Sequence, residues 1–192
     1  LTIDPSDMKL IWSDEFEGDA LNTNNWTYEI GNGNWGWGNN EQEYYTSSTD
    51  NVYVNNGTLK ISARKQSVGG KNYTSGRIKT AGKVEVGNGY VVAKIKLPSA
   101  KGIWPAFWML GTNGQTWPMC GEIDIMEYID CWSSKEYQIN VHVTDKKNGN
   151  RIKKMNPQLV KADVSKFHIY TLEWYKDKLV FLLDGNLCYQ FD

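Results

Sequence analysis

The chain has 192 residues, a length typical of one compact domain and sufficient to bury a sizeable core. Its formal net charge of −1 gives no electrostatic reason to expect binding to nucleic acid or to an anionic membrane surface. No apolar run in the sequence approaches the roughly 20 residues of a membrane-spanning helix. Composition therefore predicts a single globular domain over residues 1–192 that has neither nucleic acid nor membrane as a partner.

Short β-rich runs recur along the chain between turn signals, so the sequence predicts an all-β protein. Their spacing of roughly 8–12 residues favours a sandwich or barrel over alternating strands and helices. The predicted strands are 9–12, 52–54, 59–63, 76–80, 83–86, 90–97, 106–110, 122–128, 138–144, 167–175 and 179–183. Asn, Asp and Gly mark tight turns at 55–57, 87–89, 148–149 and 184–185. Residues 157–165 indicate a helical turn or a loop.

Residues 31–45 are the first segment whose composition suggests a binding role. They contain four Gly, four Asn, two Trp and two Tyr. Gly and Asn favour a tight loop, and the amide side chains can both donate and accept the hydrogen bonds that hydroxyl groups require. An ordinary structured loop explains the same composition, so the segment alone leaves both interpretations open.

Aromatic residues gather just before the most acidic part of the chain. Trp104 and Trp108 are four residues apart and would share one face of a strand over residues 102–110. Trp117 then leads into the acidic segment. Nine Trp and eleven Tyr in the whole chain are more than core packing readily explains, although at least one of these tryptophans is expected in the core. Exposed aromatic rings suit stacking against the apolar faces of sugar rings.

The acidic segment, residues 121–128, is the strongest functional signal in the chain. Side chains alternate faces along a strand, so Glu122 and Asp124 share one face while the two isoleucines share the other. Met126 interrupts this alternation, and one extra residue in a β-bulge would return Glu127 to the acidic face. Like charges on one face repel, which favours a functional site over a solvated surface strand.

The three cysteines are predicted to be free thiols. An odd number leaves at least one without an intramolecular partner. Cys120 and Cys131 flank the acidic strand, and eleven extended residues span roughly 36 Å, far beyond the ~7 Å Cα limit of a disulfide. These two cysteines cannot pair unless the chain doubles back.

These motifs together resemble the laminarinase branch of glycoside hydrolase family 16, the endo-β-1,3-glucanases. The bulged acidic strand with its extra Met126 is specific to that branch, because relatives that cleave mixed-linkage β-1,3-1,4-glucans lack the inserted residue. The resemblance implies an all-β jelly-roll β-sandwich of two curved antiparallel sheets, of the concanavalin A-like lectin and glucanase type. The matching segments are 12–16, 31–46, 73–77, 95–98, 102–110, 121–128 and 167–174 with Asp184-Gly185.

The resemblance implies retaining hydrolysis of internal β-1,3-glycosidic bonds in β-glucan polysaccharides or oligosaccharides. Glu122 would be the nucleophile and Glu127 the general acid/base, with Asp124 between them. Retaining glycosidases need two carboxyl groups on either side of the scissile bond, which this strand can supply. No cofactor is required for that chemistry.

The resemblance also implies substrate-binding residues and a structural cation. The substrate-binding residues would be Asn39, Arg77, Trp104, Trp108, Trp117 and His142. His168 aligns with a position that we interpret as structural. A structural calcium ion would be bound by Glu15 and the backbone of Gly57.

Two features depart from the family pattern. Residues 89–92 read Gly-Tyr-Val-Val where relatives have Gly-Arg-x-Glu, so a polar pair is replaced. The chain also ends before the final strand of the family, which supplies a third calcium ligand. We therefore expect a domain truncated at its C-terminus, less stable than a full-length relative or completed by another C-terminal segment or a second chain.

Other functions remain open at this stage. The chain could be a non-catalytic or weakly active β-glucan-binding protein, although such relatives lose the acidic motif. Within enzymes, the alternatives are a transglycosylase or a mixed-linkage glucanase. A calcium-binding structural β-domain explains neither the aromatic loop nor the three carboxylates. An extracellular, secreted location is expected because a polymeric substrate cannot enter a cell.

Overall fold

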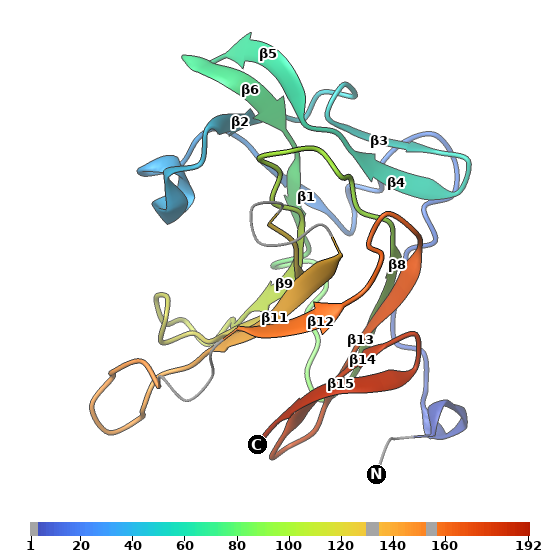
Figure 1. Cartoon of the computed structure of the whole chain (residues 1–192), viewed down its shortest axis with the longest axis vertical. Coiled ribbons are helices and arrows are strands. Elements are labelled where there is room, and N and C mark those ends of the chain that lie inside the picture. The colour runs from blue at the N-terminus through green and yellow to red at the C-terminus, as the bar shows by residue number, and fades with distance from the viewer. Residues whose placement is uncertain (1–3, 130–134, 153–156) are drawn as a thin grey trace. The chain divides into compact units, whose positions relative to one another are not determined.

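The computed structural model describes residues 4–129, 135–152 and 157–192 (Figure 1). The chain divides into two compact units, one formed by residues 4–85 and the other by residues 86–192. The regular secondary structure of both units consists almost entirely of strands, as the sequence predicts. Among the described residues, no helix is long and apolar enough to cross a membrane.

The unit of residues 4–85 contains three small sheets, with strand orders β1-β7, β2-β6-β5 and β3-β4. Within it, a small cluster of Leu21, Val52 and Val54 is buried, with partly buried aromatic side chains packed around it. The elements are η1 (Pro5–Asp7), β1 (Thr27–Glu29), η2 (Gly36–Asn40), β2 (Glu43–Tyr45), β3 (Val52–Asn55), β4 (Thr58–Ile61), β5 (Arg64–Val68), β6 (Lys71–Ser75) and β7 (Arg77–Lys79).

The turn between β3 and β4 confirms the turn signal at residues 55–57. Asn56 and Gly57 both have positive φ angles, of 51° and 70°. Two successive left-handed residues form the kind of turn that matches the twist of a hairpin, and Asn-Gly is the pair that adopts it at least cost. Asn55 and Thr58 then pair directly across the hairpin.

The unit of residues 86–192 contains two four-stranded sheets, with strand orders β12-β11-β10-β9 and β15-β14-β13-β8. Among the described residues, every strand pair in these sheets is antiparallel. The strands are β8 (Gly89–Ile95), β9 (Ala106–Leu110), β10 (Glu122–Glu127), β11 (Glu136–His142), β12 (Gln158–Lys161), β13 (His168–Trp174), β14 (Leu179–Leu183) and β15 (Asn186–Phe191).

One apolar core joins these two sheets. β10 and β11 contribute Ile125 and Ile139, whereas β13 and β14 contribute Leu172 and Phe181, all of them at most 2% exposed. Burying such side chains contributes about 1.5–3 kcal/mol each, so this layer is the main source of stability in the unit. The unit is therefore a β-sandwich, and the face of β10 that carries its polar side chains is turned away from the core.

Two predicted strands are absent from the described residues. Residues 9–12 pair with no strand there, and Leu10 and Ile11 are 76% and 84% exposed. In residues 83–86, the backbone amides of Lys83 and Val84 both donate to the carbonyl of Thr80, which makes a turn. Local β-rich sequence alone was misleading here, because neither segment pairs with a strand in the part of the chain that the structure describes.

The prediction from sequence did not include six strands that the structure contains, namely β1, β2, β5, β6, β12 and β15. β5 reads Arg-Lys-Gln-Ser-Val and is mostly exposed, so it lacks the apolar alternation on which a strand prediction depends. The prediction of a helical turn or loop at 157–165 was wrong for its first part, since β12 pairs with residues 136–139 of β11. Pairing with a neighbouring strand, rather than local sequence, determines these elements.

The replaced polar pair at residues 89–92 has a clear structural counterpart. Glu173 on β13 is fully buried, and its carboxylate accepts hydrogen bonds from the hydroxyls of Tyr90 at 2.5 Å and Tyr175 at 2.8 Å. Tyr90 lies directly opposite Glu173 in the ladder between β8 and β13. Tyr90 therefore supplies the polar contact to the buried carboxylate.

Candidate active site

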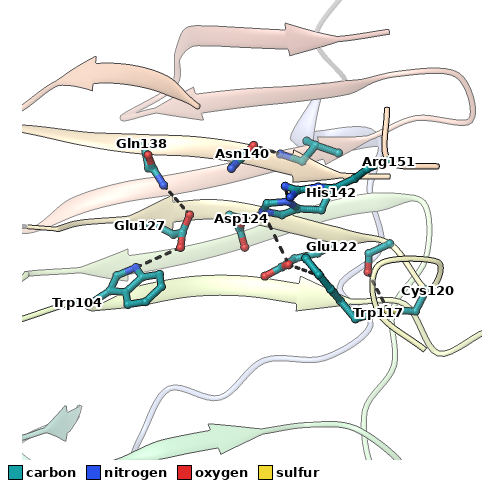
Figure 2. A network of polar contacts seen from close by, with 12 residues as sticks. Trp104, Trp117, Cys120, Glu122, Asp124, Glu127, Gln138, Asn140, His142 and Arg151 are labelled. Carbon is teal, nitrogen blue, oxygen red and sulfur yellow. Dashed lines mark hydrogen bonds and ion pairs between the residues drawn. The ribbon is translucent and has the colours of Figure 1, made fainter. Parts of the chain in front are cut away.

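The predicted β-bulge in β10 is present. On the β9 side, Asp124 pairs with Trp108 and Met126 pairs with Phe107, so one residue of β10 is extra at Ile125. The register with β11 shifts between Asp124 and Glu127 in the same way. Ile125 and Met126 are both buried in the core. The bulge returns Glu127 to the face of the other two carboxylates, as Figure 2 shows.

Glu122 lies at one end of this acidic row. Its Oε2 atom accepts a hydrogen bond of 2.7 Å from the indole nitrogen of Trp117. Burial, and then the charge of Asp124, raise the pKa of Glu122 to about 7. The Trp117 hydrogen bond opposes this shift because it stabilises the ionised carboxylate. The side chain is 16% exposed, so a substrate can reach it.

Asp124 is the most enclosed of the three carboxyl groups, with a side chain that is 2% exposed. Burial, and then the charge of Glu127, raise its pKa to about 8. A hydrogen bond joins Asp124 to Glu122, so the two groups titrate together and share a proton. Burial raises the pKa of both groups, whereas their mutual hydrogen bond lowers the pKa of Asp124 and raises that of Glu122, so the proton belongs to the pair.

Glu127 occupies the other end of the row and is held by both of its oxygens. Gln138 on β11 donates to Oε2 at 2.8 Å, and the indole of Trp104 donates to Oε1 at 3.1 Å (Figure 2). Burial raises the pKa of Glu127, against the lowering effect of these two hydrogen bonds. A raised pKa suits a group that holds a proton in the resting state and gives it up during the reaction.

His142 lies directly opposite Glu122 in the β10–β11 ladder. Its Nε2 atom is 3.1 Å from Oδ2 of Asp124 and 3.8 Å from Oε2 of Glu122. The guanidinium of Arg151 contacts the other ring nitrogen, Nδ1. Burial lowers the pKa of His142, and the positive charge of Arg151 lowers it further.

The predicted tryptophans lie at the site, although one is outside the expected strand. Trp104 precedes β9 instead of lying in it, because the strand begins at Ala106. Trp104 and Trp117 are 43% and 51% exposed, so their rings are partly accessible while their indole nitrogens donate hydrogen bonds to carboxylates. Trp108 pairs directly with Asp124 across the ladder, which places it on the face of the carboxylates.

Asn39 and Arg77 belong to the other unit, residues 4–85. Asn39 donates to Glu41 at 2.8 Å in the exposed loop that contains η2. Arg77 forms an ion pair of 3.0 Å with Glu29 and lies over the ring of Trp37, 4.5 Å from its centre. Both side chains are therefore held in defined local positions, and their roles in substrate binding remain predictions.

Sequence reasoning missed three side chains of the site: Gln138, Asn140 and Arg151. Gln138, Asn140 and His142 alternate along β11 with apolar residues between them, and they pair with the three carboxylates. That alternation was visible in the sequence and would have indicated Gln138 and Asn140 together with His142. Arg151 follows no such pattern, since it reaches the site through an isolated bridge with Thr144.

Two places could be considered for a cation. Atoms of Glu122, Asp124 and His142 converge within 4.8 Å of one another, but proton sharing and acid–base chemistry account for that cluster. In the unit of residues 4–85, Glu15 lines a surface hollow of about 320 Å³. The hollow is lined by Ser13, Asp14, Glu15, Glu17, Asn22 and Asn25. Oxygen-rich linings of this kind fit a hard cation such as calcium, although both carboxylate oxygens of Asp14 already accept hydrogen bonds from Phe16 and Trp26.

Two of the three cysteines behave as predicted. Cys120 and Cys188 are free thiols in the described part of the chain. Cys131 lies outside the described residues, so the prediction for that cysteine stays open.

Comparison with known proteins connects this geometry to a family. Residues 39–192, which include the whole site, match the family "Glycosyl hydrolases family 16". The solved structure of a laminarinase from Flavobacterium sp. UMI-01 is similar with a TM-score of 0.85 and 42% sequence identity, over 96% of this chain and 78% of that chain. This match confirms the jelly-roll fold that the sequence resemblance implies.

Two curated relatives show similar identities. The beta-glucanase of Rhodothermus marinus is 36% identical over 197 residues, which are 95% of this chain and 65% of the relative. Glucan endo-1,3-beta-glucosidase A1 of Niallia circulans is 34% identical over 203 residues, which are 95% of this chain and 29% of the relative. The chain thus spans less than two thirds of the length of these relatives.

Proposed function

Because the chain belongs to glycosyl hydrolases family 16, we propose that it hydrolyses internal β-1,3-glycosidic bonds of β-glucans such as laminarin with retention of configuration. The observation that carries this proposal is the bulge in β10, which brings Glu122, Asp124 and Glu127 onto one face. Two of the similar proteins described above are named a laminarinase and a glucan endo-1,3-beta-glucosidase, which supports this substrate class.

In the first step, a carboxylate oxygen of Glu122 attacks the anomeric carbon and forms a covalent glycosyl ester. The glycosidic carbon–oxygen bond breaks, and Glu127 gives its proton to the departing oxygen. Glu122 suits the role of nucleophile because Trp117 stabilises its ionised form. Glu127 suits the role of acid because burial raises its pKa.

In the second step, the ionised Glu127 takes a proton from a water molecule. The water oxygen attacks the anomeric carbon from the face that the leaving group vacated, and the bond to Glu122 breaks. Two displacements at one carbon return the original configuration. Asp124 supports both steps, because its shared proton can follow the charge of Glu122 as the ester forms and breaks.

Substrate binding involves two sets of residues in this proposal. Four side chains adjoin the carboxylates, namely Trp104, Trp108, Trp117 and His142. The exposed rings of Trp104 and Trp117 can stack on sugars. Asn39 and Arg77, in the unit of residues 4–85, are proposed separately as substrate-binding residues on the family resemblance.

Hydrolysis of laminarin by purified protein tests the proposal. We expect release of reducing ends, and we expect Glu122→Gln and Glu127→Gln to lose at least about 1,000-fold in kcat while still binding laminari-oligosaccharides. Asn39→Ala is a milder comparison, expected to affect KM more than kcat. Sugar binding without turnover in the unmodified chain would instead favour a non-catalytic β-glucan-binding protein.

The alternatives within enzymes differ only in the acceptor or the linkage. A transglycosylase passes the same glycosyl ester to a sugar hydroxyl instead of water, and a mixed-linkage glucanase accepts β-1,4 bonds beside β-1,3 bonds. The inserted residue in β10 favours the β-1,3 specificity. Product sizes from laminarin and from barley β-glucan separate these outcomes, because elongated products would require transfer.

We also propose a structural calcium ion at the oxygen-rich hollow beside Glu15, with the backbone of Gly57 as a further ligand. Calcium would stabilise the unit of residues 4–85 without taking part in the reaction. Addition of calcium after EDTA treatment should raise the melting temperature by a few degrees, as expected for about 1 kcal/mol of binding-linked stability. An unchanged melting temperature would remove the proposal.

Completion by a second chain is proposed at β8. This seven-residue strand is paired on one side by β13 in the described structure, and Val92 on it is 51% exposed. Open strand edges are sites at which another strand can add. Light scattering should then detect a dimer, or a complex with a separate C-terminal segment, that Val92→Pro disrupts. A wild-type protein that stays monomeric and does not bind that segment would contradict this proposal.

We further propose that the protein is secreted and acts as a single catalytic domain. The support is the size of a glucan polymer, which has to be degraded outside the cell. In the source cells, enzyme detected by antibody should appear in the medium before lysis. Detection in the cell pellet alone would overturn the extracellular assignment.

A further inference from the structure

Arg151 is one of the side chains of the site that the proposed mechanism does not use. It lies in the exposed segment after β11, where residue 151 forms a bridge with Thr144. Its guanidinium contacts Nδ1 of His142 and also lies over the ring of Trp117, 5.5 Å from the centre. Arg151 therefore contacts two of the side chains that adjoin Glu122 (Figure 2).

The identity of these partners determines where the proton of His142 lies. A guanidinium has five donors and no acceptor, and it stays protonated in proteins. Nδ1 of His142 must therefore be the acceptor in its contact with Arg151, and it cannot carry a proton. The single proton of a neutral ring then lies on Nε2, which faces Oδ2 of Asp124 at 3.1 Å.

This assignment also provides a hydrogen-bond donor for a buried carboxylate oxygen. Oδ2 of Asp124 is buried and has no other hydrogen-bond donor among the described residues. An unpaired buried carboxylate oxygen costs on the order of 1–3 kcal/mol, so a donor is expected there. The proton on Nε2 of His142 supplies that donor, and the remaining oxygen of Asp124 is free to share its proton with Glu122.

We propose that Arg151 is a positioning residue that fixes His142 as the neutral Nε2–H tautomer and so sets the protonation of the carboxylates beside it. The proposal rests on the assignment of Glu122 as nucleophile. The charged groups that face His142 are Glu122, Asp124 and Glu127 from β10, and Arg151 from the opposite side. Without Arg151, the three carboxylates would draw a second proton onto the ring.

Nitrogen NMR of the two histidines tests this directly. In the wild type, we expect the His142 ring to show a protonated Nε2 and an unprotonated Nδ1. His168 is an internal contrast, because its Nδ1 lies 2.6 Å from Asp184 and its Nε2 lies 2.8 Å from the carbonyl of Asp163. Both nitrogens of His168 face acceptors, which favours the doubly protonated ring. A proton on Nδ1 of neutral wild-type His142 would overturn the proposal.

Substitutions of Arg151 provide the second test. Arg151→Met keeps an unbranched stem against Trp117 but removes the donor and the charge, so the pKa of His142 should rise by about one unit or more. Arg151→Lys also lacks an acceptor and should retain the wild-type tautomer. Lys146→Met removes a charge from the same segment and is the matched control, with no expected change. An unaltered His142 titration in Arg151→Met would contradict the proposal.

The pH profile distinguishes positioning from a merely structural role. An imidazolium 3.8 Å from Glu122 favours the ionised carboxylate, so the acid limb of kcat/KM for laminarin should extend to lower pH in Arg151→Met. An equal loss at every pH, with an unmoved acid limb, would indicate structure alone. If the wild type does not cleave laminarin, the proposed function fails, whereas the NMR result still decides the role of Arg151.

Discussion

Asp124 is the residue that couples the charges of the site. It lies between the two glutamates on one face of β10 and is almost fully enclosed. Its charge is the second cause, after burial, of the raised pKa of Glu122. A carboxyl group in this position keeps a transferable proton within reach of the nucleophile. An asparagine side chain has no such proton, because its amide does not ionise.

The pH dependence of kcat/KM follows from these shifts. Glu122 must be ionised to attack, and its pKa is about 7, so kcat/KM should fall as the pH drops through about 7. Asp124→Asn removes the repelling charge and should move this acid limb to lower pH, while kcat falls by roughly 10–100-fold. A pH–rate profile with laminari-oligosaccharide measures both. An acid limb that stays in place would show that Asp124 does not control Glu122.

At the scale of elements, the bulge in β10 depends on residues that face the core. Met126 is 1% exposed and fills the space that the extra residue creates on the core side. Met126→Ala should lower the free energy of unfolding by about 2–4 kcal/mol, since it leaves a cavity at this point. Met119→Ala is a matched control because Met119 is 44% exposed, and it should change stability by less than about 0.5 kcal/mol. Urea denaturation measures both, and equal effects would contradict the assignment.

Asp184, in the turn after β14, links this turn to the beginning of β13. Asp184 holds the ring of His168 at 2.6 Å and accepts from the backbone amide of Ile169 at 2.8 Å. The hydrogen bond to Asp184 raises the pKa of His168. The resulting stability is fully present below the unfolded pKa of about 6.5 and is lost as the pH rises through the folded pKa.

His168→Gln should therefore destabilise the protein most in mildly acidic solution, by about 1 kcal/mol or less, and progressively less at alkaline pH. Chemical denaturation of both proteins at several pH values gives this difference. A penalty that grows with increasing pH would have the wrong sign for the proposed interaction.

The same elements show what the sequence could and could not predict. The strand at 106–110 was predictable because it is a short continuous apolar run. The bulge before Glu127 was predictable because the alternation of residues 122–125 and its interruption at Met126 are visible in the sequence. Strands such as β5, with mostly exposed polar residues, were not predictable because only pairing with β6 makes them strands. Arg151 was missed for a related reason, since a residue nine positions after His142 has no periodic relation to it.

At the scale of the whole molecule, Arg77 is a predicted substrate-binding residue that lies outside the unit of the carboxylates. The carboxylates belong to residues 86–192, whereas Arg77 belongs to residues 4–85. If Arg77 contacts the glucan, Arg77→Met should raise KM by roughly 10-fold, the equivalent of about 1.4 kcal/mol, without moving the acid limb of kcat/KM. Because Arg77 also pairs with Glu29, a melting temperature is needed to exclude simple unfolding. Unchanged KM in a folded variant would remove Arg77 from the substrate site.

Azide rescue is the most direct measurement of the central assignment, that Glu122 and Glu127 perform a double displacement. In Glu127→Ala, the glycosyl ester on Glu122 can still form from an activated β-glucoside, and azide should release it as a β-glycosyl azide. In Glu122→Ala, azide should attack the substrate directly and give the α-glycosyl azide. Two opposite anomers are the predicted result. The same anomer from both variants, or no rescue of a folded protein by azide in either, would contradict the assigned roles.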